Sequence, residues 1–455
     1  MALGKRTPKT FDGVFSAKDL PPAPAHPFYQ RLNALLDEAG FDAFVEELCR
    51  PHYADGVGRP GIPPGVYFRM LFAGYFEGLD SQRAIAWRCA DSRSLQAFLG
   101  YLPTEATPNH SSLTKVRRRL PQDVHERVFI WVLRLAEAKG LLKGKTVAVD
   151  ATLLEANAAM KGIIRRDTGD DWKAYLRQLA AEAGLEDPSD EELRRFDRQR
   201  KGKKVSNEEW VSPADPDSKI SKMKDGTTHL AYKAEHVVDL DSGLVLAAQV
   251  YPADEPDSAT VVDSLLAAQV NLTCAGSETE VEEAVADKGY HKAQTLADCA
   301  TLNVRTYIPE GQRSQRRVWA DKPAAWQQAY HANRRRTRGA RGRRLQRRRS
   351  EYVERSFAHV CETGGARRSW LRGLGKVTKR YVAQVAACNL GGIMRRLCGR
   401  GTPRGLQGAA AAALAWLGAL LRSLAARGAV PATPDAGDRV IAWPAPNAYH
   451  RYAMS

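Results

Sequence analysis

The spacing of apolar residues predicts that the first part of the chain is helical. Phe28, Leu32, Leu35 and Leu36 fall at positions i, i+4, i+7 and i+8, which places them on one stripe of an amphipathic helix. Similar patterns predict five further helices. The first starts after Pro63-Pro64, the second runs from Asp80 or Ser81 through Trp87, and the third lies near Leu95 and Phe98. The fourth runs from Asn109 or Ser111 to Leu120, and the fifth covers about 122–139. We therefore expect an all-α domain over residues 26–140, preceded by a Pro-rich flexible leader over residues 1–25.

The periodicity changes near Lys143, where a sheet is predicted to begin. The run Thr146–Asp150 is short and apolar, ends in a carboxylate, and is typical of a buried strand. The stretch that follows is charged and mostly helical in pattern, with a capping box formed by Ser189 and Glu192. We expect this stretch to be a helical insertion over residues 155–224.

Strand patterns return after the insertion. Two strands are predicted over His229–Asp239 and Leu244–Tyr251, joined by a turn rich in Asp, Ser and Gly. Alternate residues of the first strand are expected to share one face, namely Leu230, Tyr232, Ala234, His236 and Val238. The remaining pattern predicts a helix from about 257, a strand over 284–286, a helix over 293–302 and a strand over 304–308.

This order predicts an α/β domain over residues 141–400, built on a mixed sheet that is flanked by helices. Asp150 and Asp287 each follow a short apolar strand. Because ligand sites of α/β sheets gather at the carboxyl ends of strands, both aspartates are placed where chemistry is expected. Taken singly, each is equally well explained as a turn or helix cap just past a strand.

The charge of the chain favours a polyanionic partner. The formal net charge is +16 and the pI is about 9.5, so nucleic acid is the first candidate and an anionic membrane surface the second. The helix that ends near Leu120 carries a basic cluster of Lys115, Arg117, Arg118 and Arg119. Such a helix fits a helix-turn-helix DNA-binding domain, although a purely structural or dimerising domain is the alternative.

The strongest compositional bias lies within a basic segment over residues 312–350. Between Arg334 and Arg349 there are ten arginines and no acidic residue. Because arginine forks match phosphate oxygens, we favour phosphate binding over a merely solvated face. These residues are Arg334, Arg335, Arg336, Arg338, Arg341, Arg343, Arg344, Arg347, Arg348 and Arg349.

Cysteine usage and hydropathy bear on the compartment. The seven cysteines are scattered and form no C-x-x-C pair, which argues against a disulfide framework or a zinc finger. No secretory signal is visible, and the apolar run over 408–421 is shorter than the roughly 20 residues that span a bilayer. We expect a cytoplasmic protein without a membrane partner, and an Ala/Pro-rich tail over residues 401–455.

A third carboxylate follows the arginine run. Val353, Phe357 and Val360 form the apolar stripe of a helix, and Glu354 lies beside that stripe. Carboxylates next to a basic surface would repel DNA, unless bound metal inverts the local charge. Cleavage of a phosphodiester is an in-line displacement at phosphorus. Two divalent ions about 4 Å apart, bound by carboxylate oxygens, can neutralise the charge on the attacking and leaving oxygens.

Several motifs together carry a family resemblance. In order, they are Val149–Ala158 (VDATLLEANA), Asp225–His236 (DGTTHLAYKAEH), Ala286–Tyr290 (ADKGY) and Val353–Ala358 (VERSFA). They resemble bacterial insertion-sequence transposases of the DDE superfamily, over roughly residues 25–405. The stretch 61–120 also looks like the N-terminal domain of such transposases.

The resemblance implies an RNase H-like catalytic core with the insertion after its first strand. It implies that Asp150, Asp287 and Glu354 are the catalytic carboxylates and bind two Mg²⁺ or Mn²⁺ ions. Water would be the nucleophile for nicking and a 3′-hydroxyl for strand transfer. Glu351, three residues earlier on the same side of the helix, is the alternative to Glu354, which the Val-Glu-Arg context favours.

Further DNA contacts are expected around these motifs. Lys288, Tyr290, His229 and Lys233 are candidates for contacts near the scissile phosphate, with a strand-edge or hairpin-stabilising role as the alternative. Arg355, Arg367 and Arg368 are candidate contacts to the DNA backbone. His359 is expected to be structural, since no ligand pattern surrounds it.

The sequence therefore predicts a DDE transposase, an endonuclease that cleaves and transfers DNA strands at the ends of an insertion sequence. Its partner is double-stranded DNA, and joining two ends suggests at least a homodimer. A catalytically inactive, repurposed DNA-binding protein and an RNase H-like nuclease are the two alternatives.

Overall fold

The computed structural model describes residues 25–54, 61–200, 206–223, 225–311 and 318–406. By its contacts the chain divides into two compact units, residues 1–405 and 406–455. The architecture below is that of the first unit. The expected leader and the apolar run of the expected tail lie outside the described residues.

The N-terminal part of this unit is helical, as the apolar spacing predicts. The predicted stripe of Phe28, Leu32, Leu35 and Leu36 is buried in the first helix. A second helix, over Phe41–Cys49, was not predicted from the sequence. The helices are α1 (Pro27–Glu38), α2 (Phe41–Cys49), α3 (Pro64–Glu77), α4 (Gln82–Asp91), α5 (Arg93–Phe98), α6 (His110–Arg119) and α7 (Gln122–Ala138).

Two of these helices begin where capping residues predict. The Ser81 hydroxyl accepts a hydrogen bond from the backbone N–H of Ala84 at 3.2 Å, which caps α4. Asn109 caps α6 in the same way, through the N–H of Ser112 at 2.9 Å. Each cap satisfies a backbone donor that the first helical turn leaves without a partner.

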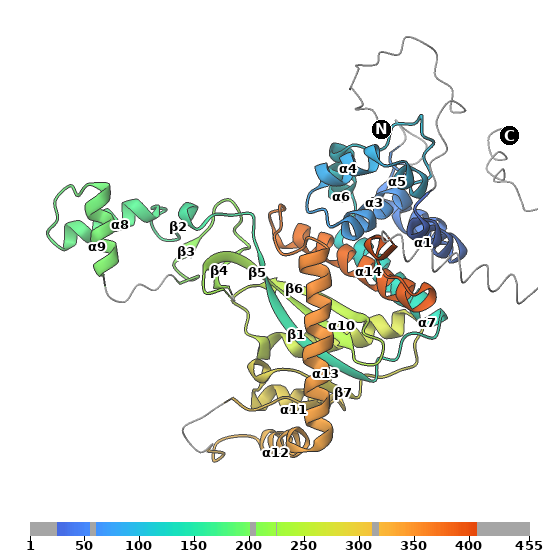
Figure 1. The fold of residues 1–455 in the computed structure, drawn as a ribbon. Helices are drawn as coiled ribbons and strands as arrows, with labels where there is room; N and C mark the ends of the chain where they lie inside the picture. Colours follow the sequence, from blue (N-terminus) through green and yellow to red (C-terminus); the bar gives the residue numbers. More distant parts are fainter. Residues whose placement is uncertain (1–24, 55–60, 201–205, 224, 312–317, 407–455) are drawn as a thin grey trace, which may run out of the picture. The chain divides into compact units, whose positions relative to one another are not determined.

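A mixed sheet forms the centre of the rest of the unit (Figure 1). Its order is β4-β5-β1-β7-β8, and β6 pairs with β5 as well. The pairs β1–β5, β4–β5 and β5–β6 are antiparallel, whereas β1–β7 and β7–β8 are parallel. The strands are β1 (Thr146–Glu155), β4 (Lys219–Lys222), β5 (Thr228–Asp239), β6 (Val245–Pro252), β7 (Glu283–Val285) and β8 (Arg305–Tyr307).

Helices cover both faces of the sheet. Side chains of β5 reach α10 from one face and α13 and α14 from the other, through Glu235 and His236 respectively. Helix α13 crosses the sheet over β1 and β7 (Figure 1), and a π-helical segment over Ala358–Thr363 continues it. The helices are α10 (Asp257–Cys274), α11 (Ala293–Thr301), α12 (Ala324–Arg338), α13 (Ala340–Phe357) and α14 (Leu374–Cys398).

The segment between β1 and β5 is less helical than predicted. It contains α8 (Trp172–Glu182) and α9 (Asp190–Gln199), and the predicted capping box of Ser189 and Glu192 is present. It also contains a small antiparallel pair, β2 (Ile164–Arg165) and β3 (Trp210–Val211), and the sheet strand β4. Trp210 of β3 packs against Trp172, at 5.2 Å between ring centroids, so aromatic packing joins this pair to α8.

His236 connects three elements in the interior. Its ring is stacked on Phe357 of α13 at 4.2 Å, and its two nitrogens lie 2.9 Å from the Ser356 hydroxyl and 2.8 Å from that of Tyr381. Complete burial lowers the pKa of His236 to about 3, so the ring is neutral. His125, also buried, has its pKa lowered to about 4.

We expect these two histidines to make the fold sensitive to acid. Between pH 6.5 and about 4, the unfolded chain binds protons on them that the folded chain does not, so stability falls as the pH falls. Each contributes about 1.4 kcal/mol per pH unit in that window. Denaturant unfolding between pH 7 and 5 should show a smaller pH slope for His236→Gln than for wild type, whereas equal slopes would contradict a buried neutral His236.

Within the described residues, no helix is long and apolar enough to cross a membrane.

Candidate active site

Asp150 lies within β1 and not at its end. The sequence predicted that the strand stops at this carboxylate, but β1 continues to Glu155 because β5 pairs with it along its full length. The parallel pairing of β1 with β7, in contrast, ends at Ala148 and Val285. Asp150 therefore lies just beyond the point where the two parallel strands separate.

Asp287 lies at the matching position after β7. Extending the register from Ala148 and Val285 by two residues on each strand brings Asp150 and Asp287 opposite each other. Asp287 caps a short 3₁₀ turn over Lys288–Tyr290, accepting a hydrogen bond from the N–H of Gly289 at 2.8 Å. The two aspartates thus lie side by side where the parallel pairing of β1 and β7 ends.

Two hydrogen-bond donors and one like charge surround the Asp150 carboxylate. One oxygen accepts the N–H of Ala151 at 2.9 Å, and the other accepts a guanidinium N–H of Arg349 from α13 at 2.6 Å. Burial raises the pKa of Asp150, and the negative charge of Asp287 raises it further, against the lowering effects of Arg349 and the Ala151 N–H. The electrostatic effect of Asp287 agrees with the register in placing the two carboxylates close together.

Glu354 is on the same helix as Arg349 but does not join the aspartates. Its side chain is exposed and accepts a hydrogen bond from Ser350 at 2.7 Å. Glu351, the alternative, pairs with Arg355 at 2.5 Å. In the part of the chain that the structure describes, no three His, Cys, Asp or Glu residues are grouped closely enough to hold a metal ion.

Helix α13 is held against the sheet at both ends of this region. The Gln346 amide donates to the backbone carbonyls of Ala286 and Tyr307, at 3.0 and 2.6 Å. Further along, Ser356 contacts His236 of β5. Neither Gln346 nor His236 was predicted from the sequence to be a positioning residue, because their partners are distant in the sequence.

A buried polar network supports the Asp287 turn from the other face of the sheet. Glu235 is fully buried and accepts hydrogen bonds from Ser264 at 2.5 Å, Thr260 at 2.9 Å and Tyr290 at 2.9 Å. Tyr290 follows Asp287 by three residues, so this contact holds the turn that carries Asp287. Burial raises the pKa of Glu235, which the three hydroxyl donors partly offset.

Two residues expected to contact DNA are inside the protein. Tyr290 has no exposed surface, and Lys233 is only 4% exposed. The Lys233 ammonium donates to the carbonyl of Glu255 at 2.7 Å and to Thr260 at 3.0 Å. Because neither side chain reaches the surface in this structure, a role in stabilising the fold is favoured for both over contact with DNA. Lys288 is exposed, and His229 is half-buried, 3.7 Å from Glu155.

The arginine run forms parts of two helices, α12 and α13, and about half of it is paired within the protein. Acidic residues that are distant in the sequence neutralise Arg334 (Glu310), Arg341 (Glu283), Arg348 (Asp241) and Arg349 (Asp150). Arg336 donates to the Thr306 carbonyl, and Arg343 to that of Arg338. Arg335, Arg338, Arg344 and Arg347 are exposed and form no ion pair with described residues.

The other predicted contacts differ in exposure. Lys115, Arg118 and Arg119 at the end of α6 are exposed, with Arg119 above the Tyr53 ring at 4.6 Å, whereas Arg117 is half-buried. Arg355 pairs with Glu351, Arg367 with Glu362, and Arg368 lies 3.6 Å from Glu155. His359 is half-buried, and burial lowers its pKa.

The donor chemistry at the sheet edge fits a divalent cation in part. Asp150 and Asp287 offer carboxylate oxygens, which Mg²⁺ prefers, and their mutual repulsion would be relieved by a cation between them. Arg349 supplies the positive charge in this structure. Glu354 would have to turn away from Ser350 to add a third ligand.

Comparison with known families bears on both halves of the chain. Residues 15–119 match a family described as a transposase domain (DUF772). Residues 142–390, more than half of the chain, match the transposase DDE domain, and this range contains Asp150, Asp287 and Glu354. No curated protein and no solved structure matches the chain. The two matches confirm the resemblance to insertion-sequence transposases, and the chain belongs to the family of transposases with a DDE domain.

Proposed function

We propose that this transposase cleaves and transfers DNA strands at the ends of its own insertion sequence, using Asp150, Asp287 and Glu354. The observation that carries the proposal is the meeting of Asp150 and Asp287 at one sheet edge, from strands far apart in the sequence. Both lie beneath α13, the helix that carries Glu354 and two of the exposed arginines, Arg344 and Arg347.

We infer that the catalytic domain has an RNase H-like fold. The sheet order supports this, since three antiparallel strands (β6, β5, β1) continue into two parallel ones (β7, β8). In sequence order these strands are β1, β5, β6, β7 and β8. Asp150 lies on the first of them, Asp287 just after the fourth, and Glu354 on a later helix.

The chemistry that we propose needs divalent metal, Mg²⁺ or Mn²⁺, held by the three carboxylates. Two such ions would neutralise charge on the attacking and leaving oxygens of an in-line displacement at phosphorus. The protein itself contributes the fixed edge of β1 and the Glu235-supported turn, which orient Asp150 and Asp287. Arg349 keeps Asp150 paired until a cation takes its place, and its guanidinium is then available to a DNA phosphate.

The DNA itself is proposed to lie along α12 and α13. Four exposed arginines lie on these helices, namely Arg335, Arg338, Arg344 and Arg347. Arg335 and Arg338 border an open hollow with Gln327 and His331, and Arg338 and Arg347 border a second one. Arginine matches phosphate oxygens with two parallel donors, so this surface suits a DNA backbone. Because two element ends must be joined, we further propose that at least two copies act together.

One observation favours a second function, that of a DNA-binding protein without catalysis. Glu354 accepts a hydrogen bond from Ser350, and Asp150 forms an ion pair with Arg349. The three carboxylates therefore do not form a metal site in this structure. Such a protein would bind the element ends through the same basic surfaces and leave them uncut.

Binding to the element's own ends tests the proposed function. In a DNase footprint with the full chain, we expect protection of the terminal repeats over scrambled DNA of equal length. Replacing Arg344 and Arg347 by Gln should weaken binding to both DNAs and reduce its dependence on salt, because each phosphate contact releases counterions. Equal, salt-sensitive binding to both DNAs by wild type would contradict recognition of the ends and support a general nuclease.

A further inference from the structure

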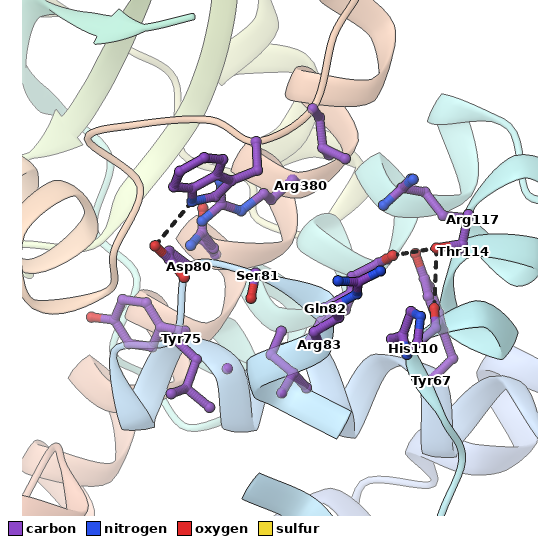
Figure 2. A pocket seen from close by; sticks show the side chains of 17 residues that line it. Tyr67, Tyr75, Asp80, Ser81, Gln82, Arg83, His110, Thr114, Arg117 and Arg380 are labelled. Atoms are coloured by element: carbon purple, nitrogen blue, oxygen red, sulfur yellow. Dashed lines mark hydrogen bonds between the residues drawn. The ribbon is translucent and has the colours of Figure 1, made fainter. Parts of the chain in front are cut away.

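A cavity lies away from the carboxylates, where the N-terminal helices meet the C-terminal part of the same compact unit. Its volume is about 230 Å³, and α3, α4, α6, the loop around Trp370 and α14 contribute to its wall (Figure 2). This volume is below the roughly 300–1,000 Å³ of sites for drug-sized molecules, so a smaller group such as one nucleobase fits it better.

The cavity is cationic. Arg83, Arg117 and Arg380 line it together with one acidic residue, Asp80 (Figure 2). None of the three arginines forms an ion pair with a carboxylate among the described residues, and Asp80 accepts the indole N–H of Trp370 at 2.9 Å. The excess of positive charge is therefore left for a ligand.

Two of these arginines are held inside the wall. The Nε of Arg117 is buried and has no hydrogen-bond partner, which is costly unless a ligand supplies an acceptor. Arg380 donates to the carbonyls of Gly365 and Arg368, and burial lowers its pKa to about 10. These groups are fixed in place and so suit a specific anion better than mobile surface charges would.

The remaining wall is flat and apolar. Tyr67, Tyr75 and Ile85 are buried side chains that line the cavity, with Leu71 and Leu79 beside them. Trp370 is 47% exposed at the rim, where the Arg368 guanidinium lies 4.9 Å from its ring. Aromatic and aliphatic walls of this kind accept an unstacked base.

Polar groups that match a base edge are also present. Gln82 accepts a hydrogen bond from Thr114 at 2.7 Å, and His110 and Gln384 lie in the same wall. An amide, a hydroxyl and an imidazole offer both donors and acceptors. An inorganic anion would use the arginines and leave these groups and the apolar walls without a role.

We propose that this cavity binds a single unpaired nucleotide, with its phosphate at Arg117 and Arg83 and its base against the tyrosines and Trp370. The inference rests on the proposed function in so far as the nucleotide belongs to the DNA being processed. A free mononucleotide has the same chemistry and is the other source. In a duplex, stacking covers both faces of a base and pairing covers one edge, so fully paired DNA does not enter the cavity.

The test uses the full chain and DNA with one unpaired 2-aminopurine, whose fluorescence changes when it stacks on an aromatic ring. We expect Arg117→Gln and Trp370→Ala to weaken binding of this DNA at least tenfold, and Trp370→Ala to leave binding of fully paired DNA little changed. Arg31→Gln, an exposed arginine of α1, is the matched control and should bind as wild type does. Titration with 2-aminopurine deoxyribonucleoside monophosphate distinguishes DNA from a free mononucleotide as the ligand. If the mononucleotide saturates the cavity and the unpaired DNA does not, the ligand is a free nucleotide.

A crosslinking measurement needs no variant and covers the case in which Arg117→Gln fails to fold. Unpaired 5-iododeoxyuridine in the same DNA should crosslink to Tyr67, Tyr75 or Trp370, as read by mass spectrometry. Crosslinks found only elsewhere, or unchanged affinity in both variants, would overturn the proposal. Protection of the element ends would persist in that event, so loss of the cavity proposal is distinct from loss of the proposed function.

Discussion

Replacing Asp150 or Asp287 by asparagine is expected to reduce DNA strand cleavage by roughly a thousandfold or more, while DNA binding is kept. Asparagine has nearly the shape of aspartate but lacks the charge that holds a divalent cation, and loss of one charge-stabilising group at an active site has effects of about this size. The measurement is single-turnover cleavage of end-bearing DNA, compared with Asp298→Asn, an exposed aspartate of α11.

The same substitution separates a catalytic from a structural role. Burial raises the pKa of Asp150, so its charged form is disfavoured in the folded protein. We therefore expect Asp150→Asn to melt at or above the wild-type temperature, as is common where a site trades stability for activity. A variant that cuts DNA at the wild-type rate would remove Asp150 from the active site, and one that melts far lower would make its role structural.

The second large effect is expected for Glu354 against its neighbour Glu351. Glu354→Gln should reduce cleavage about as much as the aspartate substitutions, because we assign it the third carboxylate position. Glu351→Gln should retain most of the activity, because Glu351 is exposed and pairs with Arg355 on the helix surface. Both variants remove one negative charge from the same helix, so the pair is internally matched, and cleavage in end-bearing DNA is again the measurement.

The opposite pattern would have a clear meaning. If Glu351→Gln were inactive and Glu354→Gln active, α13 would present its other acidic residue to the sheet and the motif alignment would be shifted by one turn. If both retained activity, the two aspartates would suffice, and the hydrogen bond of Glu354 to Ser350 would persist in the active protein.

Much of the fold follows from local pattern. The strands and turn of 229–251 and the helices from 257 and 293 are encoded by short-range periodicity and turn residues, which act within a few positions. Helix α12 (Ala324–Arg338), in contrast, was not predicted from the sequence. The buried runs before Asp150 and Asp287 were predictable for the same reason, whereas the continuation of β1 past Asp150 was not. Their meeting is explained by the parallel register of β1 and β7.

Features that depend on distant partners were not predictable. Alternation in β5 suggested one buried face, yet Leu230 through Asp239 are all buried because helices cover both sides of the sheet. The arginine run looked wholly unpaired, but four of its members meet acidic residues from other strands and loops. Arg349 was expected to bind phosphate and instead contacts Asp150, which local sequence could not indicate.

The most direct test of the account is whether the wild-type protein cuts DNA that carries the ends of its own element when Mg²⁺ or Mn²⁺ is added. We predict metal-dependent cleavage at the element boundaries, which disappears with chelator and in Asp287→Asn. Tight, specific binding to those ends without any cutting, in either metal, would contradict the assignment of Asp150, Asp287 and Glu354 and leave a DNA-binding protein.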